Sequence, residues 1–247
     1  MGLTAFRGAL GFLTTLPVGQ SPGAWEAFAD RPAVMVAVGY VLGGLLTLPL
    51  FLPLPGTVAG FGFVLSIGVF AGINNVDGLL DVADGVATHG DPAEARAAMK
   101  DSAIGVGAVL ALGLLLLGLF AVGSTLAGAP SRALLLVVAA EVSAKLAMVG
   151  VVARGTASHE GLGSALSNST GPWTLPVGVI LALPATILTF PHPAAAISVA
   201  VGLGTGLVTE YWARDRLGGI NGDVLGATNE VARLAALLAG VIAWTLW

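Results

Sequence analysis

Long apolar runs separated by short polar segments dominate this chain. A run of about 18 or more apolar residues is long enough for an α-helix to cross the hydrocarbon core of a bilayer. Seven such runs lie at residues 33–54, 57–74, 103–128, 133–153, 174–190, 194–212 and 230–247. The pattern predicts an all-α fold, a polytopic integral membrane helical bundle of about seven transmembrane helices, with an error of one, plus short interfacial helices.

The first 32 residues differ from the membrane-crossing runs. Residues 3–16 are apolar but short, are interrupted by Arg7 and end at Pro17. They lack the basic start and small-residue cleavage site of a signal peptide. We therefore expect residues 1–32 to form an N-terminal interfacial segment. No repeat, linker or low-complexity tract divides the sequence, so residues 1–247 are predicted to form a single membrane-embedded domain.

Composition supports a membrane setting. Hydrophobic residues make up 56% of the chain, which contains ten lysines and arginines in 247 residues, and this is too apolar for a soluble domain. With a net charge of -4 the sequence offers no basic face for a nucleic acid, so no nucleic-acid partner is expected. The absence of cysteine excludes disulfides, thiolate nucleophiles and iron–sulfur ligation.

Basic residues predict the orientation in the cell membrane. If the N-terminus is cytoplasmic, Arg132 is the single basic residue outside, and most of the others fall inside or at inner helix ends. Those inner residues are Arg7, Arg31, Arg96, Lys100, Arg154, Arg214, Arg216 and Arg233. The same topology puts all candidate chemistry on the cytoplasmic side. His89 and His159 fall in these loops and are expected to be solvated, with substrate contact as the alternative for His159.

Three aspartates stand close together in the polar segment that follows the second run. Asp81 and Asp84 lie four and seven positions beyond Asp77, so on a helix all three side chains share one face. Carboxylates this close repel one another unless a divalent cation binds between them. Oxygen ligands favour magnesium, manganese or calcium over zinc. The alternative is three solvated acids on an exposed turn.

A short helix is predicted after this motif, within a cytoplasmic segment of residues 75–103. Asp91, Pro92 and Glu94 form a capping-box pattern with proline at the first helical position. This helix would lie in the interface and carry Arg96 and Lys100 close to the acidic cluster.

The third run opens with polar and small residues. Lys100, Asp101 and Ser102 precede Gly105 and Gly107. A helix N-terminus with free backbone N–H groups and small residues suits phosphate oxygens. The alternative is a membrane helix that begins with an ordinary Asp or Ser cap.

A second acidic segment lies near the C-terminus, within residues 213–230. Asp223 and Glu230 are seven positions apart and share a helix face, and Gly226 lets a backbone or ligand approach closely. This segment is predicted to be a second cytoplasmic half-site. The alternative is a helix start with Asp223 as its N-cap.

The order of these motifs resembles the cobalamin-5'-phosphate synthase family, also called adenosylcobinamide-GDP ribazoletransferase. The likeness rests on five segments that span nearly the whole chain: residues 12–17 (FLTTLP), 77–85 (DGLLDVADG), 99–105 (MKDSAIG), 160–163 (EGLG) and 222–227 (GDVLGA) with Glu230. Thr15 departs from the pattern, because a basic residue is expected before the Leu-Pro pair.

The resemblance implies a magnesium-dependent membrane enzyme that joins adenosylcobinamide-GDP to α-ribazole or its 5'-phosphate and releases GMP. Asp77, Asp81 and Asp84 would hold Mg²⁺ on the diphosphate, which a displacement of this kind requires. The base that accepts the hydroxyl proton is left open among Asp84, Asp101 and Asp223. Residues expected to contact substrate are Asn74, Arg96, Lys100, Ser102, Glu160 and Glu230.

Other functions use similar parts. CDP-alcohol phosphotransferases and membrane prenyltransferases also bind magnesium through aspartates, but neither family's full motif occurs here. A cation-coupled transporter is a further alternative, with Glu141 and Lys145 as a buried pair inside a span, although we favour a structural pair or a substrate-pocket contact. Small residues such as Gly202 and Gly206 permit close helix packing, either in a homo-oligomer or within one chain.

Overall fold

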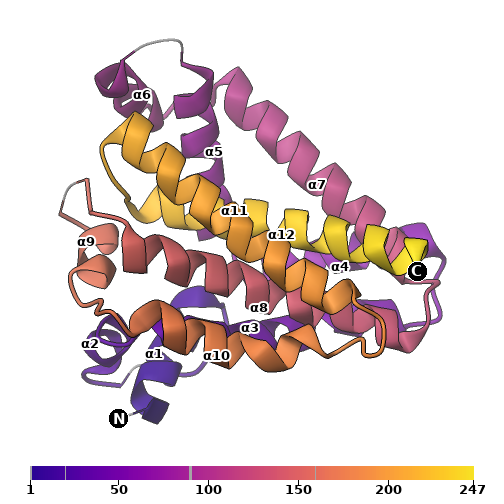
Figure 1. Ribbon diagram of the computed structural model, residues 1–247. Helices are drawn as coiled ribbons and strands as arrows, with labels where there is room; N and C mark the ends of the chain where they lie inside the picture. The colour runs from indigo at the N-terminus through magenta and orange to yellow at the C-terminus, as the bar shows by residue number, and fades with distance from the viewer. Residues whose placement is uncertain (1, 20, 89–90, 159) are drawn as a thin grey trace.

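The computed structural model describes residues 2–19, 21–88, 91–158 and 160–247. Its α-helices are α1 (Gly2–Leu13), α2 (Ala24–Ala29), α3 (Met35–Thr47), α4 (Gly56–Phe70), α5 (Asn74–Ala87), α6 (Pro92–Met99), α7 (Val106–Leu126), α8 (Ser131–Arg154), α9 (Leu162–Ser167), α10 (Thr174–Thr186), α11 (Ala194–Leu217) and α12 (Gly222–Leu246). Two short 3-10 helices, η1 (Pro32–Val34) and η2 (Leu48–Phe51), flank α3. The arrangement confirms the predicted all-α membrane fold (Figure 1). His89 and His159 lie outside the described residues.

The described residues contain five or six candidate membrane spans. In the described chain, five helical segments are long and apolar enough to cross a membrane: Pro32–Phe51, α7, α8, α11 and α12. A sixth results if α4 and α5, bent by 98°, count as one broken span or re-entrant loop. Six lies within the error of the predicted seven, and five does not. The run at 174–190 accounts for part of the difference, because its helix, α10, has 13 residues and is too short to count as a span.

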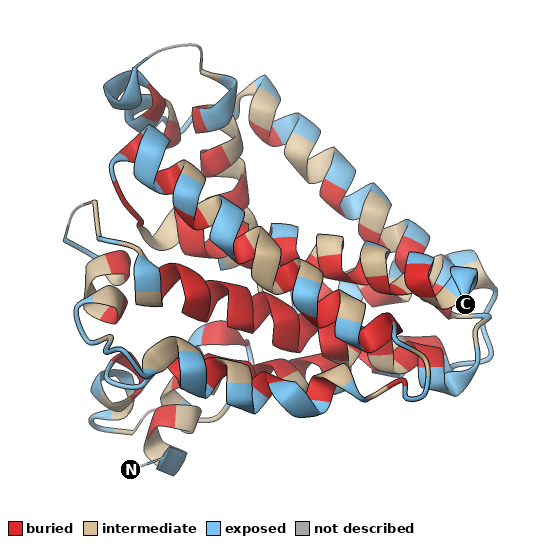
Figure 2. Ribbon diagram, viewed as in Figure 1, coloured by how far each residue is buried: buried red, intermediate tan, exposed pale blue. Residues whose placement is uncertain are grey.

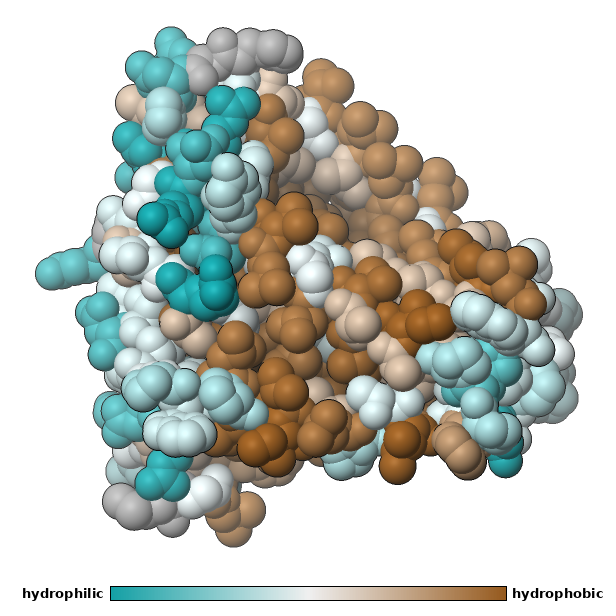
Figure 3. Space-filling view, in the orientation of Figure 1, coloured by the Kyte–Doolittle hydropathy of each residue, from teal (hydrophilic) through white to brown (hydrophobic). Residues whose placement is uncertain are grey.

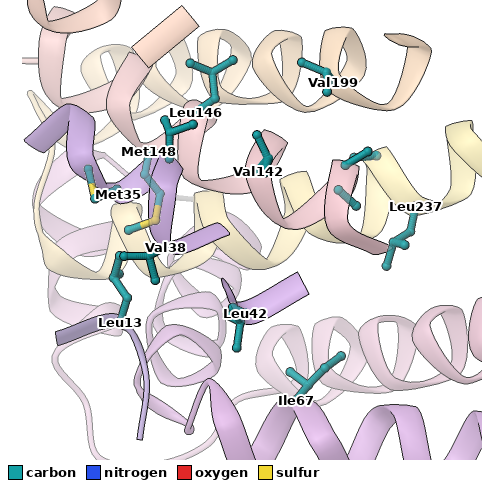
Figure 4. Packing of buried hydrophobic residues seen from close by; sticks show 14 of the residues in the cluster. Leu13, Met35, Val38, Leu42, Ile67, Val142, Leu146, Met148, Val199 and Leu237 are labelled. Carbon is teal, nitrogen blue, oxygen red and sulfur yellow. The ribbon is translucent and has the colours of Figure 1, made fainter. Parts of the chain in front are cut away.

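Helix α8 is the centre of the bundle. It is buried at every position from Ala139 to Val152 and packs against α3, α10, α11 and α12. Figure 2 shows α8 as an almost unbroken buried helix between partly exposed neighbours. Apolar side chains of α1, α3, α4, α11 and α12 belong to the same core (Figure 4). Groups in the middle of α8 therefore meet protein rather than lipid or water.

Glycines let two neighbouring helices approach α8 closely. A Cβ atom at Gly43 of α3 would lie 2.6 Å from the Cα atom of Val138, and one at Gly206 of α11 would lie 2.7 Å from that of Ala147. Real Cβ atoms do not occupy such positions, so glycine permits this spacing. Gly206 thus packs within one chain, which is one of the two interpretations that its small-residue pattern left open.

An apolar belt lies between two hydrophilic ends of the molecule. Figure 3 shows hydrophilic residues gathered at the end that carries α6 and α9, with a smaller group at the opposite end. Large apolar side chains face outward between them, including Phe61 of α4, Leu117 of α7 and Ile180 of α10. So much exposed apolar surface is favourable in contact with lipid. The protein is a multi-pass membrane protein.

The break between α4 and α5 sets the direction of the acidic helix. Gly72 adopts a φ of 75°, which glycine tolerates better than other residues. Beyond it, α5 turns away from α4 and packs against α7 and α12 at the hydrophilic end (Figure 1). The backbone N–H of Thr15, in the loop after α1, donates to the carbonyl of Phe70 at 2.9 Å and supports this bend. Helix α5 therefore lies outside the five straight spans.

Two neighbouring glycines of α11 should respond differently to alanine. Gly206→Ala should lower the free energy of unfolding by about 1–3 kcal/mol, because the added methyl group would press on the backbone of Ala147. Gly204→Ala is the matched control, since an added Cβ atom there meets no described atom within 4 Å. It should leave stability unchanged or raise it by up to about 1 kcal/mol. Thermal unfolding in detergent micelles measures both, and equal shifts would contradict the packing.

Candidate active site

The two acidic motifs meet where α5 crosses α12. A Cβ atom at Gly78 would lie 2.8 Å from the backbone oxygen of Asp223, and one at Gly226 would lie 3.0 Å from the Cα atom of Asn75. Glycine at both positions lets the two backbones come into contact. The structure therefore brings the two predicted half-sites together at the hydrophilic end of the bundle.

Asp81 lies at the centre of the acidic cluster. Burial and then the charges of three neighbouring carboxylates raise the pKa of Asp81 from 3.8 to about 6. In decreasing order of effect, these neighbours are Asp223, Asp77 and Asp84. Asp223 of α12 thus raises the pKa of Asp81 more than Asp77 or Asp84 of α5 does. A cation bound here would relieve the repulsion that the raised pKa reports.

These carboxylates fit a Mg²⁺ site in which phosphate oxygens of the substrate would provide the remaining ligands. Among the described residues, no three Asp, Glu or His side chains are arranged to hold an ion by themselves. Mg²⁺ is commonly held by one or two carboxylates together with phosphate oxygens and water. Exposed Asp77 and partly buried Asp81 offer two such carboxylates from adjacent turns of α5. The donor chemistry therefore suits a magnesium–diphosphate group.

Asp84 binds the start of α7. Its Oδ2 accepts a hydrogen bond from the backbone N–H of Gly105, and its Oδ1 accepts one from the backbone N–H of Ala108, both at 2.8 Å. These bonds tie α5 to α7 and satisfy two N–H groups at a helix N-terminus. The sequence predicts a phosphate site at this helix start. Two of the N–H groups there already donate to Asp84 and are not available to a phosphate.

The turn before α7 holds two more of the predicted residues. Asp101 and Ser102 are exposed, and the Oδ1 of Asp101 accepts a hydrogen bond from the N–H of Ala103 at 3.0 Å. Asp101 and Asp84 line one pocket of about 310 Å³. Both side chains therefore bond the backbone near the start of α7.

Asn221, rather than Asp223, caps α12. The Oδ1 of Asn221 accepts a hydrogen bond from the N–H of Val224 at 2.9 Å, and its Nδ2 donates to Oδ2 of Asp223 at 3.2 Å. The alternative in which Asp223 is the N-cap is therefore wrong. The sequence analysis missed Asn221, although an asparagine directly before a helix is a common N-cap.

Two basic side chains line the same pocket as Asp223. Helix α6 begins with the predicted capping box, in which Asp91 accepts from the N–H of Glu94 and Glu94 accepts from the N–H of Asp91. A pocket of about 200 Å³ is lined by Arg96, Met99, Lys100, Ser158, Leu217, Asn221 and Asp223. Arg96 also donates from Nη1 to the carbonyl of Leu217 at 3.1 Å. The expected acidic neighbours of these cations were the aspartates of α5, and the acidic residue that shares their pocket is Asp223 of α12.

The other predicted substrate contacts lie in different settings. Asn74 is exposed at the first turn of α5. Glu160 is exposed in the loop that follows Ser158, whose N–H donates to the carbonyl of Ile220 at 2.9 Å, so this loop passes beside the start of α12. Glu230 is buried inside the bundle, where its carboxylate accepts hydrogen bonds from Asn229 and Arg233. Its oxygens are therefore already bound by protein groups.

Comparisons with known proteins agree with one another. The family model described as "Cobalamin-5-phosphate synthase" matches residues 5–241. Adenosylcobinamide-GDP ribazoletransferase of Halorubrum lacusprofundi is 47% identical over 255 aligned residues that cover 99% of each chain. The proteins of the same name from Haloquadratum walsbyi and Deinococcus radiodurans are 41% and 38% identical, covering 100% and 96% of this chain and 100% and 84% of their own. No solved structure matches the chain.

The raised pKa of Asp81 predicts a pH-dependent stability in the absence of divalent cations. The folded pKa of Asp81, about 6, exceeds its ordinary value of 3.8. The contribution of Asp81 to the free energy of unfolding is therefore fully present below pH 3.8 and is lost as pH rises through about 6. In EDTA, wild type should therefore lose stability relative to Asp81→Asn between about pH 4 and pH 7. Adding Mg²⁺ near neutral pH should stabilise wild type more than the variant.

Thermal unfolding across this pH range measures the difference. Asp215→Asn, which removes an exposed acid of α11 at the same end of the molecule, is the control and should follow wild type. Parallel pH curves for wild type and Asp81→Asn would contradict the carboxylate cluster.

Amide substitutions should separate the anchoring aspartate from the exposed one. Asp84→Asn should lower the free energy of unfolding by about 1–2 kcal/mol, because an amide offers one acceptor atom where two backbone N–H groups need a partner. Asp77→Asn should leave stability unchanged or raise it, since it removes repulsion without breaking those bonds. Unfolding at neutral pH without Mg²⁺ tests this, and equal stability of the two variants would argue against the anchoring role of Asp84.

Proposed function

The chain belongs to the cobalamin-5-phosphate synthase family, and we propose how its membrane bundle carries out the reaction. It is a transferase of cobalamin biosynthesis, an adenosylcobinamide-GDP ribazoletransferase. In the proposed reaction, a hydroxyl of α-ribazole or of its 5'-phosphate attacks the phosphorus on the cobinamide side of the diphosphate. The bond from this phosphorus to the bridging oxygen breaks, and GMP leaves.

The observation that carries this proposal is the meeting of acidic and basic side chains at the α5–α12 crossing. The charge of Asp223 raises the pKa of Asp81, and Asp223 also lines a pocket together with Arg96 and Lys100. A diphosphate needs cations around its oxygens, and the reaction also needs a proton acceptor. Both kinds of group occur together here, at the hydrophilic end of the molecule.

Asp77 and Asp81 are the proposed magnesium ligands. Mg²⁺ bound between them and the diphosphate would neutralise phosphate oxygens and stabilise the charge that develops on departing GMP. Arg96 and Lys100, which share a pocket with Asp223, would bind further phosphate oxygens. Asp84 supports this arrangement by fixing α5 against α7 through its two backbone hydrogen bonds.

Asp223 is the proposed general base among the three candidates. Both oxygens of Asp84 accept backbone hydrogen bonds, and Asp101 lies on an exposed turn. Asp223 lines the pocket of the two cations and lies at the contact between α5 and α12. It would accept the proton of the ribazole hydroxyl as the new bond to phosphorus forms.

We further propose that the site faces the cytoplasm in the cell membrane. Segments 75–103 and 213–230 both reach the hydrophilic end that carries α6 and α9, and most basic residues belong to segments at that end. A cytoplasmic excess of lysine and arginine is the usual pattern in membrane proteins. The lipid bilayer surrounds the apolar belt, and residues 1–32 would lie in its interface.

Single carboxylate variants should separate the proposed roles in a transfer assay. Purified protein receives adenosylcobinamide-GDP, α-ribazole and Mg²⁺, and both GMP and the cobamide product are measured. Asp77→Asn and Asp81→Asn should lower turnover by about 100-fold at limiting Mg²⁺ and recover partly at high Mg²⁺, since each loses a metal ligand. Asp223→Asn should lower kcat by about 10²–10⁴-fold without such recovery, since it loses the proton acceptor.

Controls keep the outcomes distinct. Asp215→Asn should retain wild-type turnover. A lower turnover in this variant would indicate a general effect of charge. Release of GMP without α-ribazole would indicate hydrolysis instead of transfer, and ion-driven uptake into proteoliposomes without release of nucleotide would indicate a transporter. Near-normal turnover in Asp223→Asn would exclude it as the base.

A further inference from the structure

Five polar side chains inside the bundle form a closed ring that joins α8 to α12. Lys145 donates from Nζ to Oε2 of Glu141 and to Oδ1 of Asn229, each at 2.8 Å. Asn229 donates from Nδ2 to Oε1 of Glu230 at 2.8 Å. Arg233 closes the ring by donating from Nη1 to Glu230 and from Nε to Glu141.

The ring is buried and electrically balanced. Its five residues are at most 1% exposed, and its two cations match its two carboxylates. Removing one partner would leave a buried charge without a counter-charge, which is costly in a protein interior and in a membrane. Since α8 and α12 each contribute side chains, this pairing is satisfied only over a narrow range of rotation and depth of α12 against α8.

The geometry connects this ring to the proposed active site. Glu230 follows Asp223 by seven residues, about 10 Å along the same helix. Gly226 lies between them, at one of the positions where the backbones of α12 and α5 are in contact. Helix α8 is held in turn by α3, α10 and α11. A rotation or shift of α12 would therefore change how Asp223 meets the aspartates of α5.

We propose that the ring of Glu141, Lys145, Asn229, Glu230 and Arg233 is a positioning device, which sets the register of α12 so that Asp223 lies against the acidic face of α5. These residues touch no reacting group and act through Asp223. The inference rests on the proposed function for its kinetic consequences, whereas the position of α12 can be measured independently. It also gives Glu230 a role different from substrate contact.

The decisive variant replaces the two ring members of α8 together. Glu141→Leu with Lys145→Met removes one charge of each sign and keeps the volume similar, so the interior stays neutral and the Arg233–Glu230 pair within α12 remains. Apolar replacement of a buried ion pair is often tolerated by folding. Asn229→Ala is a milder second variant, because it cuts one side of the ring and leaves the ion pairs in place.

The position of α12 is measured first, without any substrate. The chain has no cysteine, so spin labels can be attached at cysteines introduced for Arg132 and Thr245, which are exposed residues of α8 and α12. Double electron–electron resonance then reports the distance between the two helices. The double variant should shift or broaden this distance, and a distribution identical to that of the intact ring would overturn the proposal.

Kinetics then test whether the register acts through Asp223. The double variant should lower kcat by about 10–100-fold, because a small misplacement of a catalytic group is enough for such a loss. Asp223→Asn should cost much less in the double variant than in wild type, since both changes remove the same contribution. Fully additive losses, or normal kcat despite a shifted α12, would overturn the positioning role.

Glu210→Gln is the matched control. Glu210 of α11 is also a buried carboxylate and pairs with Arg154 of α8 at 3.8 Å, but it connects α8 to α11 instead of α12. It should leave the label distance and kcat unchanged. If wild type showed no transfer at all, the proposed function would fail, while the distance measurement would still test the ring.

Discussion

Charge pairing inside the bundle is the constraint on which the arrangement of the other helices depends. Helix α8 carries Glu141 and Lys145 where protein surrounds it on all sides, so neither charge can be solvated. Their remaining partners come from α12, which places Arg233 beside the carboxylate and Asn229 beside the amine. Helix α12 therefore links the two regions, because it begins at the acidic site and also pairs with the buried charges of α8.

Repulsion instead of pairing marks the acidic cluster at the hydrophilic end, because the aspartates of α5 and Asp223 carry the same charge. Helix α5 bends away from α4 at Gly72 and presents aspartates beside Asp223, which raises the pKa of Asp81. Repulsion of this kind costs stability and gains nothing unless a cation and an anionic ligand bind there. The diphosphate of the substrate would be the anion, and magnesium would supply the positive charge that balances the aspartates.

Local patterns predicted much of this chain. The capping box at Asp91, the membrane bundle and the buried pair of α8 were foreseen, because each depends on neighbouring residues in one segment. Other predictions failed or shifted. The cap of α12 is Asn221, and Asp84 binds the start of α7, since each of these roles depends on where a side chain points once the helices are in place.

Sequence patterns alone indicated the membrane setting, the all-α class, the acidic and basic motifs and, through the resemblance, the family. These follow from the length of apolar runs and from residue spacing within single segments. The tertiary structure alone decided that Arg233 meets Glu141 and that Gly226 meets Asn75. Such contacts depend on the rotation and depth of one helix against another, which the spacing of residues within a single helix does not determine.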